Sequence, residues 1–119
     1  MLDLEPQSDR IQKALIYAKE NLAEPLSVAE LAEVACLSVR QFTRAFTAET
    51  GQSPAKAIEM LRTESARAMM EDGQCPIETV ASATGFGDRE RMRRAFLRAF
   101  GQPPLAIRRS VRSGAAAEG

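Results

Sequence analysis

Residues 85–104 read GFGDRERMRRAFLRAFGQPP, and this stretch predicts the fold. At about 100° per residue, its apolar side chains fall on one side of a helix that begins near Arg89. The apolar side holds Met92, Ala95, Phe96, Ala99 and Phe100, and the opposite side holds Glu90, Arg91, Arg94 and Arg98. We therefore predict a short amphipathic helix with a guanidinium-rich outer face.

The same pattern occurs earlier in the chain, where residues 37–54 read LSVRQFTRAFTAETGQSP. The Arg-Ala-Phe string at 44–46 matches the one at 94–96, and Gly-Gln-x-Pro at 51–54 matches 101–104. A repeat of this kind indicates two copies of one structural unit.

Composition restricts the class of protein. The chain has 119 residues, of which 45% are hydrophobic and 27% charged, as expected for a small globular fold. No apolar run approaches the roughly 18 residues of a membrane span. The start, MLDLEPQSDR, lacks the basic and apolar regions of a secretory signal. We expect a cytoplasmic protein with no membrane partner.

The sequence contains Cys36 and Cys75 but no histidine. Neither cysteine has a second ligand pair nearby, so zinc coordination and a disulfide framework are poorly supported. We expect reduced, packed thiols, no metal and no cofactor. The sequence also lacks a nucleophile–base pair and a glycine-rich phosphate loop, which argues against an enzyme.

The net charge of zero hides an uneven distribution. Residues 1–74 carry 8 basic and 12 acidic side chains, whereas residues 75–119 carry 8 basic and 4 acidic ones. The neutral total argues against a nucleic-acid partner, but the electrostatic field follows the local charges. The C-terminal half is therefore the more basic part of the chain.

Turn and capping residues divide the chain into helices. Predicted N-caps are Ser8 or Asp9, Ser27 with Glu30, Ser38 with Gln41, Ser53 before Pro54, and Asp88. No glycine or proline interrupts residues 55–72, which predicts one long helix. The predicted organisation is an extension (1–8), a first helix-turn-helix subdomain (9–53), a linker helix (54–72), a second subdomain (73–109) and a flexible tail (110–119). The fold class is all-α, with about seven helices.

Two short helices joined by a brief turn are typical of a helix-turn-helix. Its second helix fits the DNA major groove, where an arginine fork can bind O6 and N7 of guanine. The outward positions of the two units are Arg40, Thr43, Arg44 and Thr47, then Glu90, Arg93, Arg94 and Leu97. The linker helix would set both reading helices for neighbouring grooves, roughly 34 Å apart.

The paired strings LSVAELAEVACLSVRQFTRAFTAETGQSP and PIETVASATGFGDRERMRRAFLRAFGQPP resemble the two halves of the AraC/XylS transcription regulators. The resemblance covers residues 26–109. The Ala-x3-Gly-Phe turn followed by Phe-x3-Phe-Gly-x-x-Pro is the more specific signature. The Arg-Ala-Phe strings look most like members with an N-terminal domain similar to class I glutamine amidotransferases. Two positions depart from the family pattern, Ala57 and Ile107, and both remain apolar.

The resemblance implies a bacterial regulator that binds a double-stranded DNA operator, with RNA polymerase as a partner if it activates. It also implies a missing N-terminal effector or dimerisation domain. Carried over to this sequence, the base-reading positions are Arg40, Thr43, Arg44, Arg89, Glu90, Arg91, Arg93 and Arg94. We predict phosphate contacts from Ser27, Arg98, Arg108 and Arg109, since helix N-termini and flanking arginines hold the DNA backbone.

Each prediction has an alternative. The arginines of residues 89–98 could form a solvated face, although five arginines without a lysine are unusual for one. Glu90 could accept a hydrogen bond from cytosine N4, or it could hold a neighbouring arginine in place. The whole domain could bind another protein instead of DNA.

Overall fold

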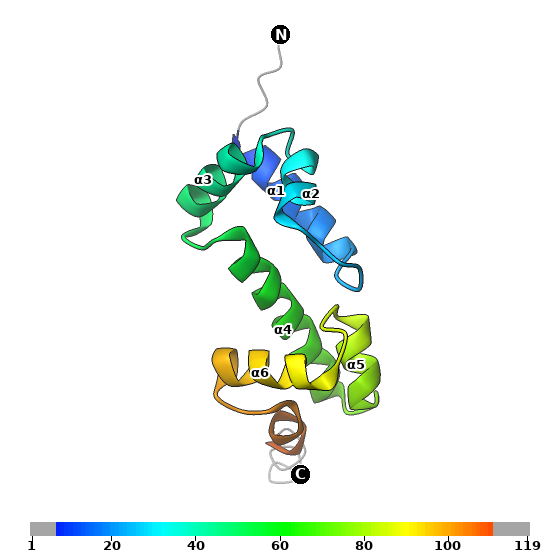
Figure 1. Cartoon of the computed structure of the whole chain (residues 1–119). Helices are drawn as coiled ribbons and strands as arrows, with labels where there is room; N and C mark the ends of the chain where they lie inside the picture. Colours follow the sequence, from blue (N-terminus) through cyan, green and yellow to red (C-terminus); the bar gives the residue numbers. More distant parts are fainter. Residues whose placement is uncertain (1–6, 111–119) are drawn as a thin grey trace. The chain divides into compact units, whose positions relative to one another are not determined.

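The computed structural model describes residues 7–110, and every regular element within that range is an α-helix. Residues 104–110 are helical as well, and they follow six helices that are labelled in Figure 1: α1 (Gln7–Glu20), α2 (Val28–Val34), α3 (Val39–Thr50), α4 (Pro54–Asp72), α5 (Ile77–Ala83) and α6 (Arg89–Phe100). The predicted all-α class is confirmed for these residues.

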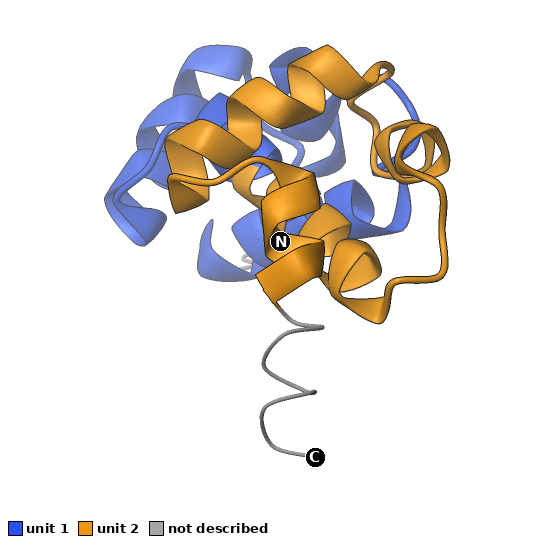
Figure 2. Cartoon of the chain, turned by 90° about the horizontal axis from the view of Figure 1, so that it is seen from below, with its two compact units in different colours: residues 1–59 blue, residues 60–119 orange. Residues whose placement is uncertain are grey.

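The chain divides into two units, residues 1–59 and 60–119, which Figure 2 colours separately. The boundary falls inside α4. Ala57 and Ile58 are buried in its N-terminal part, whereas Ala66 and Met70 belong to the core of the second unit. The helix predicted as a separate linker thus supplies buried residues to both units.

Helices α1, α2 and α3 pack against one another in the first unit, as Figure 1 shows. Their fully buried side chains include Ile11, Leu31, Phe42 and Phe46. The rings of Phe42 and Phe46 lie 5.5 Å apart between centroids, because residues four apart share one face of a helix. The buried face of α3 leaves its polar face outward.

The second unit repeats this arrangement with α5 packed on α6. Its core includes Met70, Val80, Met92 and Phe96, each fully buried. The Phe96 and Phe100 rings meet edge to face with centroids 5.2 Å apart. Both units therefore place an amphipathic second helix over an apolar core.

Several predicted caps are confirmed. Ser38 and Gln41 form both hydrogen bonds of a capping box, at 3.1 Å each. The Ser53 hydroxyl accepts a hydrogen bond from the Lys56 amide. The Asp88 carboxylate accepts one from the Arg91 amide at 2.8 Å. These bonds satisfy amides that have no partner within the helix.

The predicted N-cap at Ser27 is confirmed, but the cap at Ser8 or Asp9 and the reciprocal Glu30 contact at Ser27 are wrong. Ser8 and Asp9 lie inside α1, which begins at Gln7. Ser27 does accept a hydrogen bond from the Glu30 amide, but the Glu30 carboxylate does not complete a box. It accepts a hydrogen bond from the Tyr17 hydroxyl of α1 instead, so a contact between helices replaces the local one.

Burial differs from the prediction at two positions. Ala99 is exposed and Phe100 half-buried, because the buried stripe of α6 ends at Phe96.

Cys36 and Cys75 are both free thiols, as predicted. Cys36 is exposed, however, so the expectation of a packed thiol is wrong there.

The predicted extension and tail fall mostly on residues 1–6 and 111–119, which lie outside the described residues. Gln7 and Ser8, assigned to the extension, belong to α1. Ser110, assigned to the tail, is helical. Within residues 7–110, no helix combines the length and apolar character needed to cross a bilayer.

The helix-turn-helix turns differ in length by one residue, since residues 35–38 separate α2 from α3 and residues 84–88 separate α5 from α6. The residue two positions after each first helix has a left-handed backbone. It is Gly85 in the second unit, with φ 87°, and Cys36 in the first, with φ 60°. A non-glycine residue is strained in this region by about 1–2 kcal/mol.

We therefore expect Cys36→Gly to stabilise the first unit by about 0.5 kcal/mol, since relief of strain exceeds the extra entropy of glycine in the unfolded chain. Gly85→Ala should destabilise the second unit by about 1–2 kcal/mol. Thermal unfolding of both variants measures the two effects. A lower melting temperature for Cys36→Gly would contradict the strain argument.

Candidate nucleic-acid interface

Helix α3 carries its predicted reading residues on the face opposite Phe42 and Phe46. Arg40 and Arg44 are exposed, and Thr43 is half-buried. Within residues 7–110, neither Arg40 nor Arg44 forms an ion pair. Among the described residues, no acceptor therefore competes for the guanidinium donors of these two arginines.

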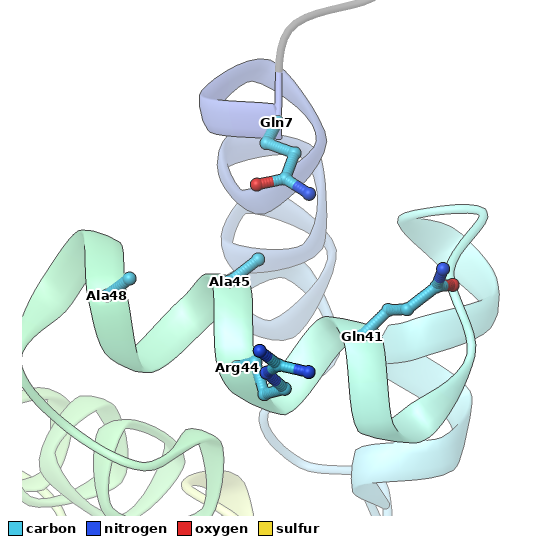
Figure 3. A pocket seen from close by; sticks show the side chains of 5 residues that line it. All are labelled: Gln7, Gln41, Arg44, Ala45 and Ala48. Carbon is cyan, nitrogen blue, oxygen red and sulfur yellow. The ribbon is translucent and has the colours of Figure 1, made fainter.

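A cavity of about 450 Å³ opens between the start of α1 and this face of α3. Figure 3 shows the Gln7 side chain extending from α1 toward Arg44, while Gln41 turns toward the segment that leads into α3. Ala45 and Ala48 complete the lining. The short alanine side chains leave the Arg44 side chain room to change direction.

Helix α6 has a different arrangement, centred on Glu90. Its carboxylate accepts two hydrogen bonds from Arg93, from Nε at 3.1 Å and from Nη2 at 2.9 Å. It accepts a third from Arg94 Nε at 3.2 Å. All three side chains are at least half exposed. Glu90 thus holds both neighbouring arginines in place, which was one of the two alternatives for this residue.

The Arg93 guanidinium group, and then that of Arg94, lower the pKa of the Glu90 carboxyl to about 2. A depressed pKa means that the ionised form is favoured in the folded state. The contribution of this pair is present above the pKa of the unfolded chain and is lost as the pH falls through about 2. Glu90 therefore stays ionised throughout the neutral range.

We expect the Glu90 side-chain carboxyl to titrate near pH 2 in a carbon-detected NMR experiment. Arg93→Ala should raise this pKa toward the usual value, because it removes the larger of the two causes. Arg98→Ala is the matched control on the same helix, since no Arg98 contribution to this pKa is found. A Glu90 midpoint unchanged by Arg93→Ala would contradict the observed bidentate contact.

Arg89 joins α6 to α5 through Glu78. The Arg89 Nη1 atom lies 2.9 Å from Glu78 Oε2, and both side chains are more than half exposed. An exposed pair of this kind adds little stability, so its main consequence is to orient Arg89. Arg91 and Arg98 are exposed on the same helix.

A second cavity, of about 300 Å³, lies beside the start of α6 and brings together predicted base and phosphate contacts. Arg109 lines it alongside Arg89, Glu90 and Arg93. Its other lining residues are Ile77, Pro103, Pro104 and Leu105. Arg109 thus lies beside three of the residues of α6 that are predicted to read bases, although it comes from residues 104–110.

Arg108 has a role within the protein that the sequence did not reveal. Its Nε donates to the Met70 carbonyl at 3.1 Å, and its Nη2 donates to the Cys75 carbonyl at 2.7 Å. The Met70 carbonyl, in the last turn of α4, also accepts a hydrogen bond from the Gly73 amide at 3.2 Å, so the Arg108 side chain adds a second donor there. Arg108, which we predicted to contact phosphate, therefore uses two of its hydrogen-bond donors inside the second unit.

Ser27 is exposed, but its hydroxyl oxygen is occupied by the Glu30 amide. Helix α2, which follows it, has only 7 residues. A phosphate contact at Ser27 would have to use its backbone amide or the hydroxyl hydrogen.

Comparison with known proteins identifies relatives of this arrangement. The helix-turn-helix domain family matches residues 31–110. The HTH-type transcriptional regulator Rv1931c of Mycobacterium tuberculosis is 40% identical over 83 residues, covering 70% of this chain and 32% of the relative. The transcriptional activator RhaS of Pectobacterium carotovorum is 30% identical over 98 residues, covering 82% of this chain and 35% of the relative. The chain thus spans about a third of the length of these relatives.

Two solved structures resemble the whole fold. The DNA-binding domain of AdpA, a global transcriptional factor solved in complex with a target DNA, has a TM-score of 0.83 and 30% identity. The similarity covers 87% of this chain and 94% of that one. An AraC-type regulator from Chromobacterium violaceum has a TM-score of 0.81 and 25% identity, covering 87% and 93% of the two chains.

Proposed function

Because this chain belongs to the AraC-type family of helix-turn-helix DNA-binding domains, we propose that it binds a specific double-stranded DNA operator and thereby regulates transcription. The observation that carries the proposal is the outer face of α6, where arginines surround one carboxylate on a helix whose opposite face is buried. A helix of this width enters the major groove and presents those side chains to base edges.

In this proposal, α3 and α6 read neighbouring segments of the major groove. Arg40, Thr43 and Arg44 are the base-reading residues of α3. In α6 the corresponding residues are Arg89, Arg91, Arg93 and Arg94, with Glu90 orienting two of them. Helix α4 has no glycine or proline after Pro54 and joins the two units covalently.

Phosphate contacts are assigned to Arg98 and Arg109, with Ser27 contributing at the start of α2. Both arginines are exposed, and Arg109 lines the cavity beside the reading residues. Arg108 instead stabilises the end of α4 through its two carbonyl contacts. Phosphate contacts fix the register of a protein on DNA without reading the DNA sequence.

We further propose that this domain serves a longer regulator, since it spans about a third of its relatives' length. The remaining part would supply an effector or dimerisation domain. The resemblance to regulators with a glutamine amidotransferase-like domain favours one candidate for it. RNA polymerase would be a partner if the regulator activates, and the bacterial cytoplasm its location.

Selection of bound duplexes from a random DNA library at near-physiological salt tests the function. The expected result is a single enriched motif with two separate blocks of specified base pairs, one for each reading helix. Enrichment of no motif, with equal binding to all duplexes, would refute sequence-specific recognition. The salt concentration must be fixed, because phosphate contacts make affinity strongly salt-dependent.

A further inference from the structure

Exposed apolar side chains mark both proposed reading helices. Among residues 7–110, the exposed large apolar side chains are Ile16, Val39, Leu97 and Leu105. Val39 lies on α3 and is 48% exposed, and Leu97 lies on α6 and is 39% exposed. Neither side chain is counted among the buried core residues of its unit, and the exposed part of each is available to an external apolar group.

Leu97 lies among the proposed base-reading residues. It follows Arg94 by three positions and Arg93 by four, so the three side chains are neighbours on one face of α6. Arg93 and Arg94 are both held outward on Glu90. A base edge that comes within reach of Arg94 therefore also comes close to Leu97.

Val39 occupies the first position of α3, directly after the Ser38 cap. The capping box fixes the direction of this first turn. Thr43 lies one turn further on the same face, and Arg40 is adjacent in sequence. The first turn of a reading helix commonly contacts base edges, which places Val39 beside the DNA.

The major groove offers an apolar partner at thymine, whose C5-methyl group projects into it. The other groove-facing groups of the four bases are hydrogen-bond donors and acceptors. We propose that Leu97 and Val39 each contact the C5-methyl group of a thymine in the operator and so determine specificity at those two base pairs. This inference rests on the proposed DNA-binding function.

The experiment replaces each thymine of the selected operator, one at a time, with deoxyuridine. This change removes the methyl group and keeps the base-pairing pattern. The dissociation constant is then measured for the wild type, Leu97→Ala and Val39→Ala. Loss of one buried methyl contact should weaken wild-type binding roughly fourfold, which corresponds to about 0.8 kcal/mol.

The expected result is a specific pairing of residue and base. At the thymine contacted by Leu97, deoxyuridine should raise the dissociation constant of the wild type and of Val39→Ala but not that of Leu97→Ala. At the thymine contacted by Val39, it should raise the dissociation constant of the wild type and of Leu97→Ala but not that of Val39→Ala. Ile16→Ala is the matched control, because Ile16 is exposed on α1 and outside the proposed interface. It should respond to every replacement as the wild type does.

Two outcomes would overturn the inference, and they differ. If the protein selects a motif but all variants show the wild-type pattern of deoxyuridine sensitivity, the methyl contacts are refuted while DNA reading stands. If no motif is selected, the proposed function fails and the inference fails with it. Because both side chains are exposed, unchanged thermal unfolding of the variants should confirm that they fold.

Discussion

Arg94→Ala is expected to weaken binding to the selected operator by about 1–3 kcal/mol, roughly 5- to 150-fold in the dissociation constant, and to relax preference at one base pair. Arg94 is exposed on α6 and contacts Glu90 through Nε, which leaves the two terminal nitrogens for a guanine. Fluorescence anisotropy on the operator and on random duplex DNA measures both affinities.

Arg94→Lys separates base reading from charge. Lysine keeps the positive charge but lacks the planar fork that pairs with O6 and N7 of guanine. We expect it to retain affinity for random DNA and to lose most of the preference for the operator. Equal losses on operator and random DNA for Arg94→Ala would refute its assignment as a base reader.

Arg109→Ala should weaken binding to every sequence alike and reduce the salt dependence.

Phe96→Ala is expected to have the largest effect on stability. Phe96 is fully buried in the core of the second unit and packs edge to face with Phe100. Truncation of such a ring leaves a cavity and costs about 3–5 kcal/mol, a large part of the 5–15 kcal/mol that holds a typical domain folded. Chemical denaturation followed by circular dichroism measures the loss.

Phe100→Ala is the matched control four residues later on the same helix. Phe100 is half-buried and also lies under the Arg67 guanidinium group, 4.8 Å from the ring centroid. Its truncation should cost less than that of Phe96, because part of the ring surface is already exposed to water. Equal destabilisation by the two variants would contradict the burial pattern of α6.

The elements of the fold were readable from the sequence because their signals are local. Ser38 and Gln41 are three residues apart and complete a capping box without help from any other segment. Gly51 and Gly101 end their helices with left-handed φ values of 78° and 71°, which glycine adopts without strain. Periodicity placed Met92 and Phe96 inward, and both are buried.

The failures occurred where a distant segment competes with a local signal. Glu30 has the spacing of a capping-box residue, yet Tyr17 occupies its carboxylate. The internal role of Arg108 was missed as well, because the carbonyls of Met70 and Cys75 accept two of its donors; its phosphate contact stays a prediction. No sequence pattern indicates that the Met70 carbonyl, in the last turn of α4, lies within reach of Arg108, which is 38 residues later.

For the predicted base-reading residues of α6, the sequence predicted a shared helix face but not the contacts between the side chains. Helical phase placed Arg93, Arg94 and Glu90 on one face, and the structure adds that the carboxylate binds both guanidinium groups. The assignment of these residues to particular bases remains a prediction. Val39 and Leu97 are apolar residues on the polar faces of their helices. The repeat does not explain why these two positions are apolar.

Helices α3 and α6, proposed to read DNA, differ where the repeat equates Arg40 with Glu90, because only the second unit has a carboxylate between its arginines. A regulator that read DNA through such unequal halves would recognise a non-palindromic sequence. The orientation of such a site along the DNA would fix the orientation of the bound protein. Inverting the site relative to a promoter would therefore also invert the bound protein.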